Sequence, residues 1–280
     1  MDLDPTAPME LEPTAPMVLH PRTREVRLLD YRAVPGDGQR SLYRFLVDNT
    51  DVKYVTVDPG TVPEDYLTSG PDLIASLPPF PPGHWNMGHV GRTQKTSQRI
   101  FYTIDTVTLP GLEDVRHGVP MDHLHFEVVE RLARAPNVFR GRHPHAPGIE
   151  VVVKHAAWPD KIKGINAEAK MYRYISGYDI GPRFLGLVKE GRRFIGFARE
   201  SVQGRRPVMG DMEACQATLE SLHDLGVVHH DPTPHFVVRP TRGVVLVDFA
   251  EAVVVEVEDD LCWTTWREDE KKYLESTLGQ

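Results

Sequence analysis

A polar loop at residues 229–235 and a carboxylate beyond it are the best candidates for chemistry in this sequence. The loop contains Asp231 and His235, and Asp248 directly follows the apolar run 244–247. If that run is one strand of a short hairpin after the loop, Asp231 and Asp248 lie at the same end of a small sheet. Neighbouring carboxylates repel each other unless a cation joins them, and carboxylate oxygens suit hard divalent cations. The spacing therefore favours a divalent-metal site.

A lysine and a glutamate farther upstream form a second candidate pair. Lys154 ends the apolar strand predicted at 149–154. Glu168 falls on the apolar face of a predicted helix, between Ile165 and Tyr172 in the helical repeat. A carboxylate that faces a core needs a cation, and Lys154 is the natural partner. The alternative, in which Glu168 lies at the edge of the stripe and reaches solvent, stays open at this point.

The histidines of the loop allow a different interpretation. His229, His230, Asp231 and His235 are all residue types that bind zinc. Adjacent residues of an extended segment point in opposite directions, so His229 and His230 do not both face one ion. We therefore favour a structural role for His229, beneath the loop.

The apolar periodicity around these residues predicts a mixed order of strands and helices. A helix from about residue 212 would begin at a capping Asp211 and end at Gly226. The predicted elements are strands at 126–132, 138–142 and 149–154, a helix at 165–176, strands at 184–188 and 193–199, a helix at 212–225, and strands at 236–238 and 244–247.

This order, with the motifs it carries, resembles the protein-kinase-like fold. His229-His230-Asp231 resembles the His-x-Asp motif of kinase catalytic loops, and Asp248-Phe249-Ala250 resembles the Asp-Phe-Gly metal motif. Lys154 matches the third-strand lysine, and Glu168 matches its partner on the following helix. The resemblance implies ATP and Mg²⁺ as cofactors. It also implies that Lys154, fixed by Glu168, holds the phosphates, that Asp248 binds the metal ion and that Asp231 orients or deprotonates a hydroxyl acceptor.

Three further segments resemble particular groups of kinase-like proteins. The run 221–226, Ser-Leu-His-Asp-Leu-Gly, is similar to the segment before the loop in aminoglycoside-phosphotransferase-like kinases. The runs 180–186 and 78–86 are similar to those of a fungal group of kinase-like proteins, whose members are sometimes labelled alpha-galactosidase A. Glycoside hydrolysis needs its own carboxylate pair. The well-placed pair here already has a kinase-like explanation, so we do not expect glycosidase activity.

Several departures from the kinase pattern favour a second hypothesis. The turn 133–137 contains no glycine, and Ala250 replaces the glycine of the metal motif. Phe236 stands where kinases have a metal-binding asparagine, although a one-residue deletion would put His235 there. His230 replaces the arginine of the catalytic loop, and the chain after Ala250 is too short for an activation segment and a full helical lobe. The alternative is a pseudokinase scaffold that binds a protein partner with little turnover.

The remaining sequence divides into a tail and an extension. Residues 1–22 repeat Pro, Thr, Ala and acidic residues, and predict a disordered tail. Residues 23–121 predict a β-rich extension with strands at 26–29, 42–47, 54–57 and 100–104 and a proline-rich connector at 77–83. Trp85 and His89 are either packed or part of a binding site. Residues 122–280 then form the kinase-like domain, so the expected class is α+β, a protein-kinase-like fold with a reduced C-lobe after a β-rich extension.

Composition limits the partners. The chain has 280 residues, a formal net charge of −8 and two cysteines. No apolar run is long enough to span a bilayer, and no block of Lys and Arg suggests nucleic-acid binding. We expect an intracellular protein, cytoplasmic or nuclear, that binds a nucleotide and an acceptor not identified by sequence.

Overall fold

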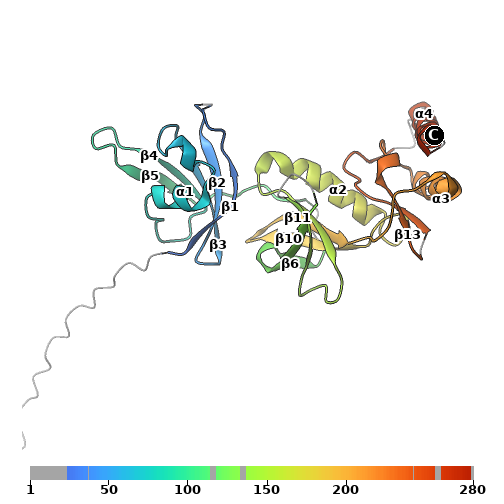
Figure 1. The fold of residues 1–280 in the computed structure, drawn as a ribbon, viewed down its shortest axis with the longest axis horizontal. Coiled ribbons are helices and arrows are strands. Elements are labelled where there is room, and N and C mark those ends of the chain that lie inside the picture. The colour runs from blue at the N-terminus through green and yellow to red at the C-terminus, as the bar shows by residue number, and fades with distance from the viewer. Residues whose placement is uncertain are drawn as a thin grey trace, which may run out of the picture. The chain divides into compact units, whose positions relative to one another are not determined.

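The computed structural model describes residues 24–36, 38–113, 118–132, 137–241, 243–255 and 260–278. These residues form a mixed α+β structure whose chain divides into two compact units between Thr106 and Val107 (Figure 1). The sequence predicts a later boundary, after residue 121. The difference arises because β6 (Pro120–Asp122) pairs with β10 (Phe184–Glu190) in the second unit. The tail predicted at 1–22 and residues 133–136 of the glycine-free turn lie outside the described residues.

The first unit is a five-stranded sheet packed on a short helix. Its strands lie in sequence order and are antiparallel, except that β3 and β4 are parallel. The helix α1 (Gly70–Ser76) was not predicted, because it is short and begins at a Gly-Pro step. The strands are β1 (Val26–Arg32), β2 (Ser41–Val47), β3 (Asp51–Val57), β4 (Met87–Arg92) and β5 (Arg99–Asp105).

The proline-rich connector at 77–83 contributes to the core of the first unit. It lies outside helices and strands, as predicted. Phe80 and Trp85 are buried in one cluster with Phe45, and the Trp85 indole N–H donates to the carbonyl oxygen of Pro81 over 2.9 Å. Trp85 is therefore packed. Its possible companion His89 instead contacts Asp58, with 2.8 Å between Nε2 and Oδ1.

The second unit begins with a six-stranded sheet in the order β6-β10-β11-β9-β8-β7. Neighbouring strands are antiparallel except β6 and β10. Helix α2 (Ile162–Tyr174) packs against β9 and β11 through its apolar face. Besides β6 and β10, the sheet contains β7 (Glu127–Arg131), β8 (Val138–Arg142), β9 (Val151–His155) and β11 (Arg193–Glu200). The predicted hairpin, third strand, helix and two further strands are all present.

The rest of the second unit combines helices with two small sheets. Helix α3 (Met212–His223) ends three residues before Gly226, whose φ of 73° suits glycine. Helix α3 contacts β14 and α4 (Asp260–Leu278), a helix that was not predicted. The short strands are β12 (Val227–Val228), β13 (Phe236–Arg239), β14 (Gly243–Leu246) and β15 (Val253–Val254), and they pair β12 with β15 and β13 with β14.

One hydrophobic core joins these parts of the second unit. It takes buried residues from the sheet, from α2 and α3, from the β13–β14 hairpin and from α4, including Val151, Tyr172, Leu219, Phe249 and Leu274. The ends of β9 and β14 are therefore fixed by the same core that holds α2. None of the helices in the described ranges has both the length and the apolar character needed to cross a membrane.

Candidate functional site

Lys154 and Glu168 form the ion pair that the sequence predicts. Residues 151–153 of β9 are buried, and Lys154 follows them toward the strand's end. Glu168 is only 2% exposed, on the face of α2 that also buries Ile165 and Tyr172. The Lys154 ammonium lies 2.6 Å from Glu168 Oε2. The alternative in which Glu168 reaches solvent is wrong.

Asp248 joins this pair and makes it a three-residue cluster. The Lys154 ammonium donates a hydrogen bond of 2.9 Å to Asp248 Oδ1. Lys154 therefore connects β9, α2 and the segment after β14. The Asp248 side chain is 44% exposed, so one side of the cluster is open to solvent while Glu168 closes the other.

Burial and charge act in opposite directions on these three groups. Burial alone lowers the pKa of Lys154, but the charges and hydrogen bonds of Glu168 and Asp248 raise it above its ordinary value. Burial alone raises the pKa of Asp248, but the hydrogen bond and charge of Lys154, and then the charge of His235, lower it below its ordinary value. Burial raises the pKa of Glu168, and Lys154 only partly offsets that rise. Lys154 and Asp248 are thus held charged at neutral pH.

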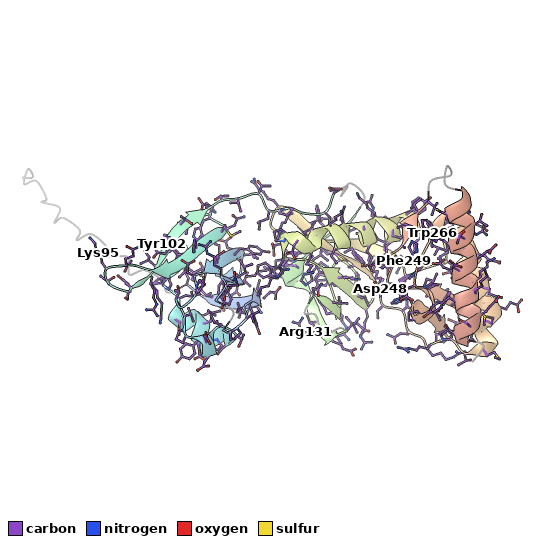
Figure 2. The ribbon with its side chains drawn as sticks, turned by 90° about the horizontal axis from the view of Figure 1, so that it is seen from above. Lys95, Tyr102, Arg131, Asp248, Phe249 and Trp266 are labelled. Carbon is purple, nitrogen blue, oxygen red and sulfur yellow. The ribbon has the colours of Figure 1, made fainter. Side chains whose placement is uncertain are left out.

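Phe249 and Tyr172 fix the backbone of Asp248. Asp248 has a φ of 59°, a left-handed conformation that is uncommon for a residue with a side chain. Its backbone N–H donates a 3.0 Å hydrogen bond to the Tyr172 hydroxyl. Phe249 is fully buried, with its ring 5.2 Å from that of Tyr172 and 5.0 Å from that of His229. Figure 2 labels Asp248 and Phe249 in this part of the second unit. A strained backbone persists where surrounding contacts determine it, as they do here.

Asp231 and His235 make the second cluster, on the loop after β12. The Asp231 side chain is 54% exposed, and its Oδ2 lies 3.6 Å from His235 Nε2. The His235 ring stacks on that of His229, with 5.7 Å between centroids. His229 is buried, its Nε2 donates to the Val247 carbonyl oxygen over 3.2 Å, and burial lowers its pKa. His229 therefore holds the loop from beneath as a neutral residue.

The two clusters are linked through the backbone. The Val247 N–H donates a 3.0 Å hydrogen bond to the His235 carbonyl oxygen, so His235 lies beside the segment that leads from β14 to Asp248. Phe236, by contrast, is 1% exposed and belongs to the hydrophobic core. Phe236 and His235 are the two positions where the kinase pattern would place a metal-binding asparagine. Only His235 is at the site. Within the described ranges, no three His, Cys, Asp or Glu residues are grouped so that they could hold a metal ion by themselves.

Glu270 of α4 is a part of the site that sequence reasoning missed. It is 5% exposed, and its Oε2 accepts a 2.7 Å hydrogen bond from His223 Nε2. Its Oε1 accepts from the backbone N–H of His230, the residue before Asp231. His230 has a φ of 68°, and its ring packs 5.3 Å from that of Trp266 on α4. Helix α4 thus contacts and orders the loop through Glu270 and Trp266.

A separate cleft of about 650 Å³ lies elsewhere in the second unit. Residues of the segments 176–183, 200–203 and 239–241 line it, and Asp179 and Arg239 form a two-pronged ion pair there with distances of 3.0 and 2.9 Å. Neither Lys154 nor Asp231 lines this cleft. Its size alone does not make it the functional site, because the charged cluster lies outside it.

Comparison with known proteins assigns this chain to no family. A scan against models of protein families finds no match, and a search of curated proteins finds no significantly similar sequence. The observations that bear on function are therefore the Lys154–Glu168–Asp248 cluster and the Asp231–His235 cluster.

Proposed function

We propose that the second unit is a protein-kinase-like, ATP-binding phosphotransferase that moves the γ-phosphoryl group of ATP to a hydroxyl acceptor. The observation that carries this proposal is the position of the Lys154 ammonium, 2.6 Å from Glu168 and 2.9 Å from Asp248. In protein kinases a strand lysine, a helix glutamate and a metal-binding aspartate meet at the phosphates of ATP. Here the three residue types occur on the corresponding elements and in the same chain order.

The order of elements supports the same proposal. Three antiparallel strands, β7 to β9, precede α2, and two more strands precede α3. A loop with Asp231 and the β13–β14 hairpin follow, and Asp248 comes two residues after the end of β14. The reduced C-lobe of the proposed kinase-like fold would consist of α3, the small sheets and α4.

The residues at the site fit the implied cofactors. Asp248 is ionised and partly exposed, so it offers the oxygen ligands that Mg²⁺ takes together with nucleotide phosphates. When bound, Mg²⁺ neutralises negative charge on those phosphates. Lys154 would hold the phosphate oxygens, with Glu168 keeping its ammonium in place. Asp231, which is exposed on its loop, would orient the acceptor hydroxyl and take its proton.

One observation favours a second candidate, a pseudokinase scaffold that binds a protein partner without turnover. Lys154 bonds directly to Asp248, the carboxylate that a metal ion requires. The position of the kinase asparagine holds the buried Phe236 in one alignment. A protein in which the lysine neutralises this aspartate has less need of a metal ion, and its fold then serves only as a binding surface.

A nucleotide titration separates these possibilities. We expect a fluorescent ATP analogue to bind the full chain more tightly with Mg²⁺ than without it. Lys154→Met should weaken that binding by about tenfold or more, because a charge-assisted contact to phosphate is lost. Lys163→Met, which removes an exposed lysine from α2, is the matched control and should change nothing. Binding followed by ATP hydrolysis supports the enzyme, binding without hydrolysis supports the scaffold, and failure to bind contradicts an ATP-binding role.

A further inference from the structure

His235 lies beside Asp231, and its backbone contacts the residue before Asp248. Its Nε2 is 3.6 Å from Asp231 Oδ2, and its carbonyl oxygen accepts the N–H of Val247, the neighbour of Asp248. Stacking on His229 fixes the plane of its ring. An imidazole therefore occupies the region where an oxygen ligand from an asparagine is expected.

We infer that His235 is a nitrogen ligand next to Asp248, and that it gives the site a preference for a transition-metal ion such as Co²⁺ over Mg²⁺. This inference rests on the proposed nucleotide site and specifies its metal ion. It concerns a departure of this chain from the kinase pattern, because an asparagine at the same place supplies an oxygen atom.

The Asp231–His235 contact supports a ligand role for the imidazole. Histidines that bind metals usually donate their other ring N–H to a carboxylate, which fixes the tautomer and makes the ring a better ligand. If Nε2 carries its proton toward Asp231, the lone pair is on Nδ1. Asp231 then orients His235 in addition to its proposed role at the acceptor.

Ligand chemistry sets the direction of the preference. Mg²⁺ prefers oxygen ligands, whereas imidazole nitrogen suits the later first-row ions, whose affinities rise from Mn²⁺ through Co²⁺. His235 and Asp248 supply two protein ligands at most, which agrees with the finding that no three such residues in the described ranges are grouped to hold an ion alone. Water would complete the coordination without nucleotide, and phosphate oxygens would replace part of that water when nucleotide is bound.

The test measures Co²⁺ binding to the full chain without nucleotide, by visible absorption and by calorimetry, with Mg²⁺ as competitor. We expect the wild-type chain to bind Co²⁺ at a site from which Mg²⁺ displaces it poorly. His235→Asn should weaken Co²⁺ binding by about tenfold or more, since even loss of a residue behind a ligand costs that much. The same change should leave Mg²⁺ binding nearly unaltered, because Asn offers an oxygen.

The matched control is His125→Asn, which makes the same substitution in another group of histidines, where His125 lies 6.2 Å from His143 between ring centroids. It should leave the His235-dependent Co²⁺ site intact. Equal Co²⁺ binding by the wild-type and His235→Asn chains overturns the inference, even if Mg²⁺–ATP binds normally. Conversely, His235-dependent Co²⁺ binding together with failure of every metal–ATP titration upholds the metal site and overturns the proposed function.

Discussion

Lys154 carries one positive charge between two carboxylates, and this excess of negative charge determines how the site responds to substitution. Asp248 is partly exposed and can be solvated when its partner is removed. Glu168 is almost completely buried and cannot. The energetic importance of Lys154 therefore comes mainly from Glu168.

Lys154→Met should lower the free energy of unfolding of the second unit by about 3 kcal/mol, because it leaves a buried carboxylate without a cation. The double variant Lys154→Met/Glu168→Leu should recover most of that loss, since two apolar side chains can replace a buried ion pair. Urea unfolding followed by circular dichroism gives both values. An unchanged midpoint for Lys154→Met alone would show that Glu168 has another source of stabilisation.

His143 gives the second unit a dependence on pH away from the site. It is 3% exposed, and burial, followed by the charge of His145, lowers its pKa, with His125 acting in the same direction and Asp122 opposing it. The unfolded chain therefore binds a proton at His143 that the folded chain does not. By this linkage, stability should fall as the pH drops below the ordinary histidine value of about 6.5.

Thermal unfolding at a series of pH values tests this dependence. We expect the melting temperature of the second unit to decrease between about pH 7 and pH 5, and His143→Gln to make that decrease shallower. His84→Gln, at an exposed histidine of the first unit, serves as the control. Identical slopes for wild type and His143→Gln would assign the acid sensitivity to other groups.

Some of these residue contacts could be predicted from the sequence, and others could not. The Lys154–Glu168 pair was predictable because the position of Glu168 on an apolar helix face demands a nearby cation. The Lys154–Asp248 bond joins residues 94 positions apart. No periodicity encodes such a contact, because it depends on how the hairpin packs against α2.

At the scale of elements, α4 is the main addition to the expected fold. Most of its residues are polar, so apolar periodicity was weak and the helix was not predicted. A pattern is nevertheless present, because Trp263, Trp266, Glu270 and Leu274 follow one another at helical spacings of three and four. Their rings and side chains face α3 and the loop at His230. A glutamate at helical spacing within this stripe of apolar residues was the signal that would have located the helix and its contact with the loop at His230.

Glu270→Ala should destabilise the second unit by about 2–4 kcal/mol, because it leaves the buried His223 imidazole and the part-buried His230 N–H without their acceptor. It should also allow the loop at Asp231 to move, which tryptophan fluorescence from Trp266 would report. Glu268→Ala, at an exposed ion pair on the same helix, should change stability by no more than about 0.5 kcal/mol. Equal effects of the two variants would mean that α4 does not order the loop.

At the scale of the whole molecule, the chain consists of two units with separate cores. The cluster of buried residues in the first unit runs from Tyr43 to Val90, and that of the second from Leu112 to Leu274. The strands of the first unit were largely predictable from alternation. The boundary was not, because a three-residue strand such as β6 has too little pattern to show which sheet it joins.

Dissection between Thr106 and Val107 should therefore give two fragments that fold independently. We expect 24–106 and 107–280 each to unfold in one cooperative transition, with the sum of their circular dichroism spectra close to that of the full chain. A fragment that binds the dye ANS and melts without cooperativity would show that it needs the other unit.

The bonds of Glu270 also have a consequence for how this protein is made. The ribosome releases the sheet, α2, α3 and the loop at 229–231 before it releases residue 270, and early segments begin to fold at once. Until residue 270 is released, the His230 N–H lacks the Glu270 carboxylate, so the loop should reach its final form only when α4 packs beside it. A stop codon placed between 255 and 270 would remove Glu270, and we expect limited proteolysis to cut that product at the loop more readily than it cuts the full chain.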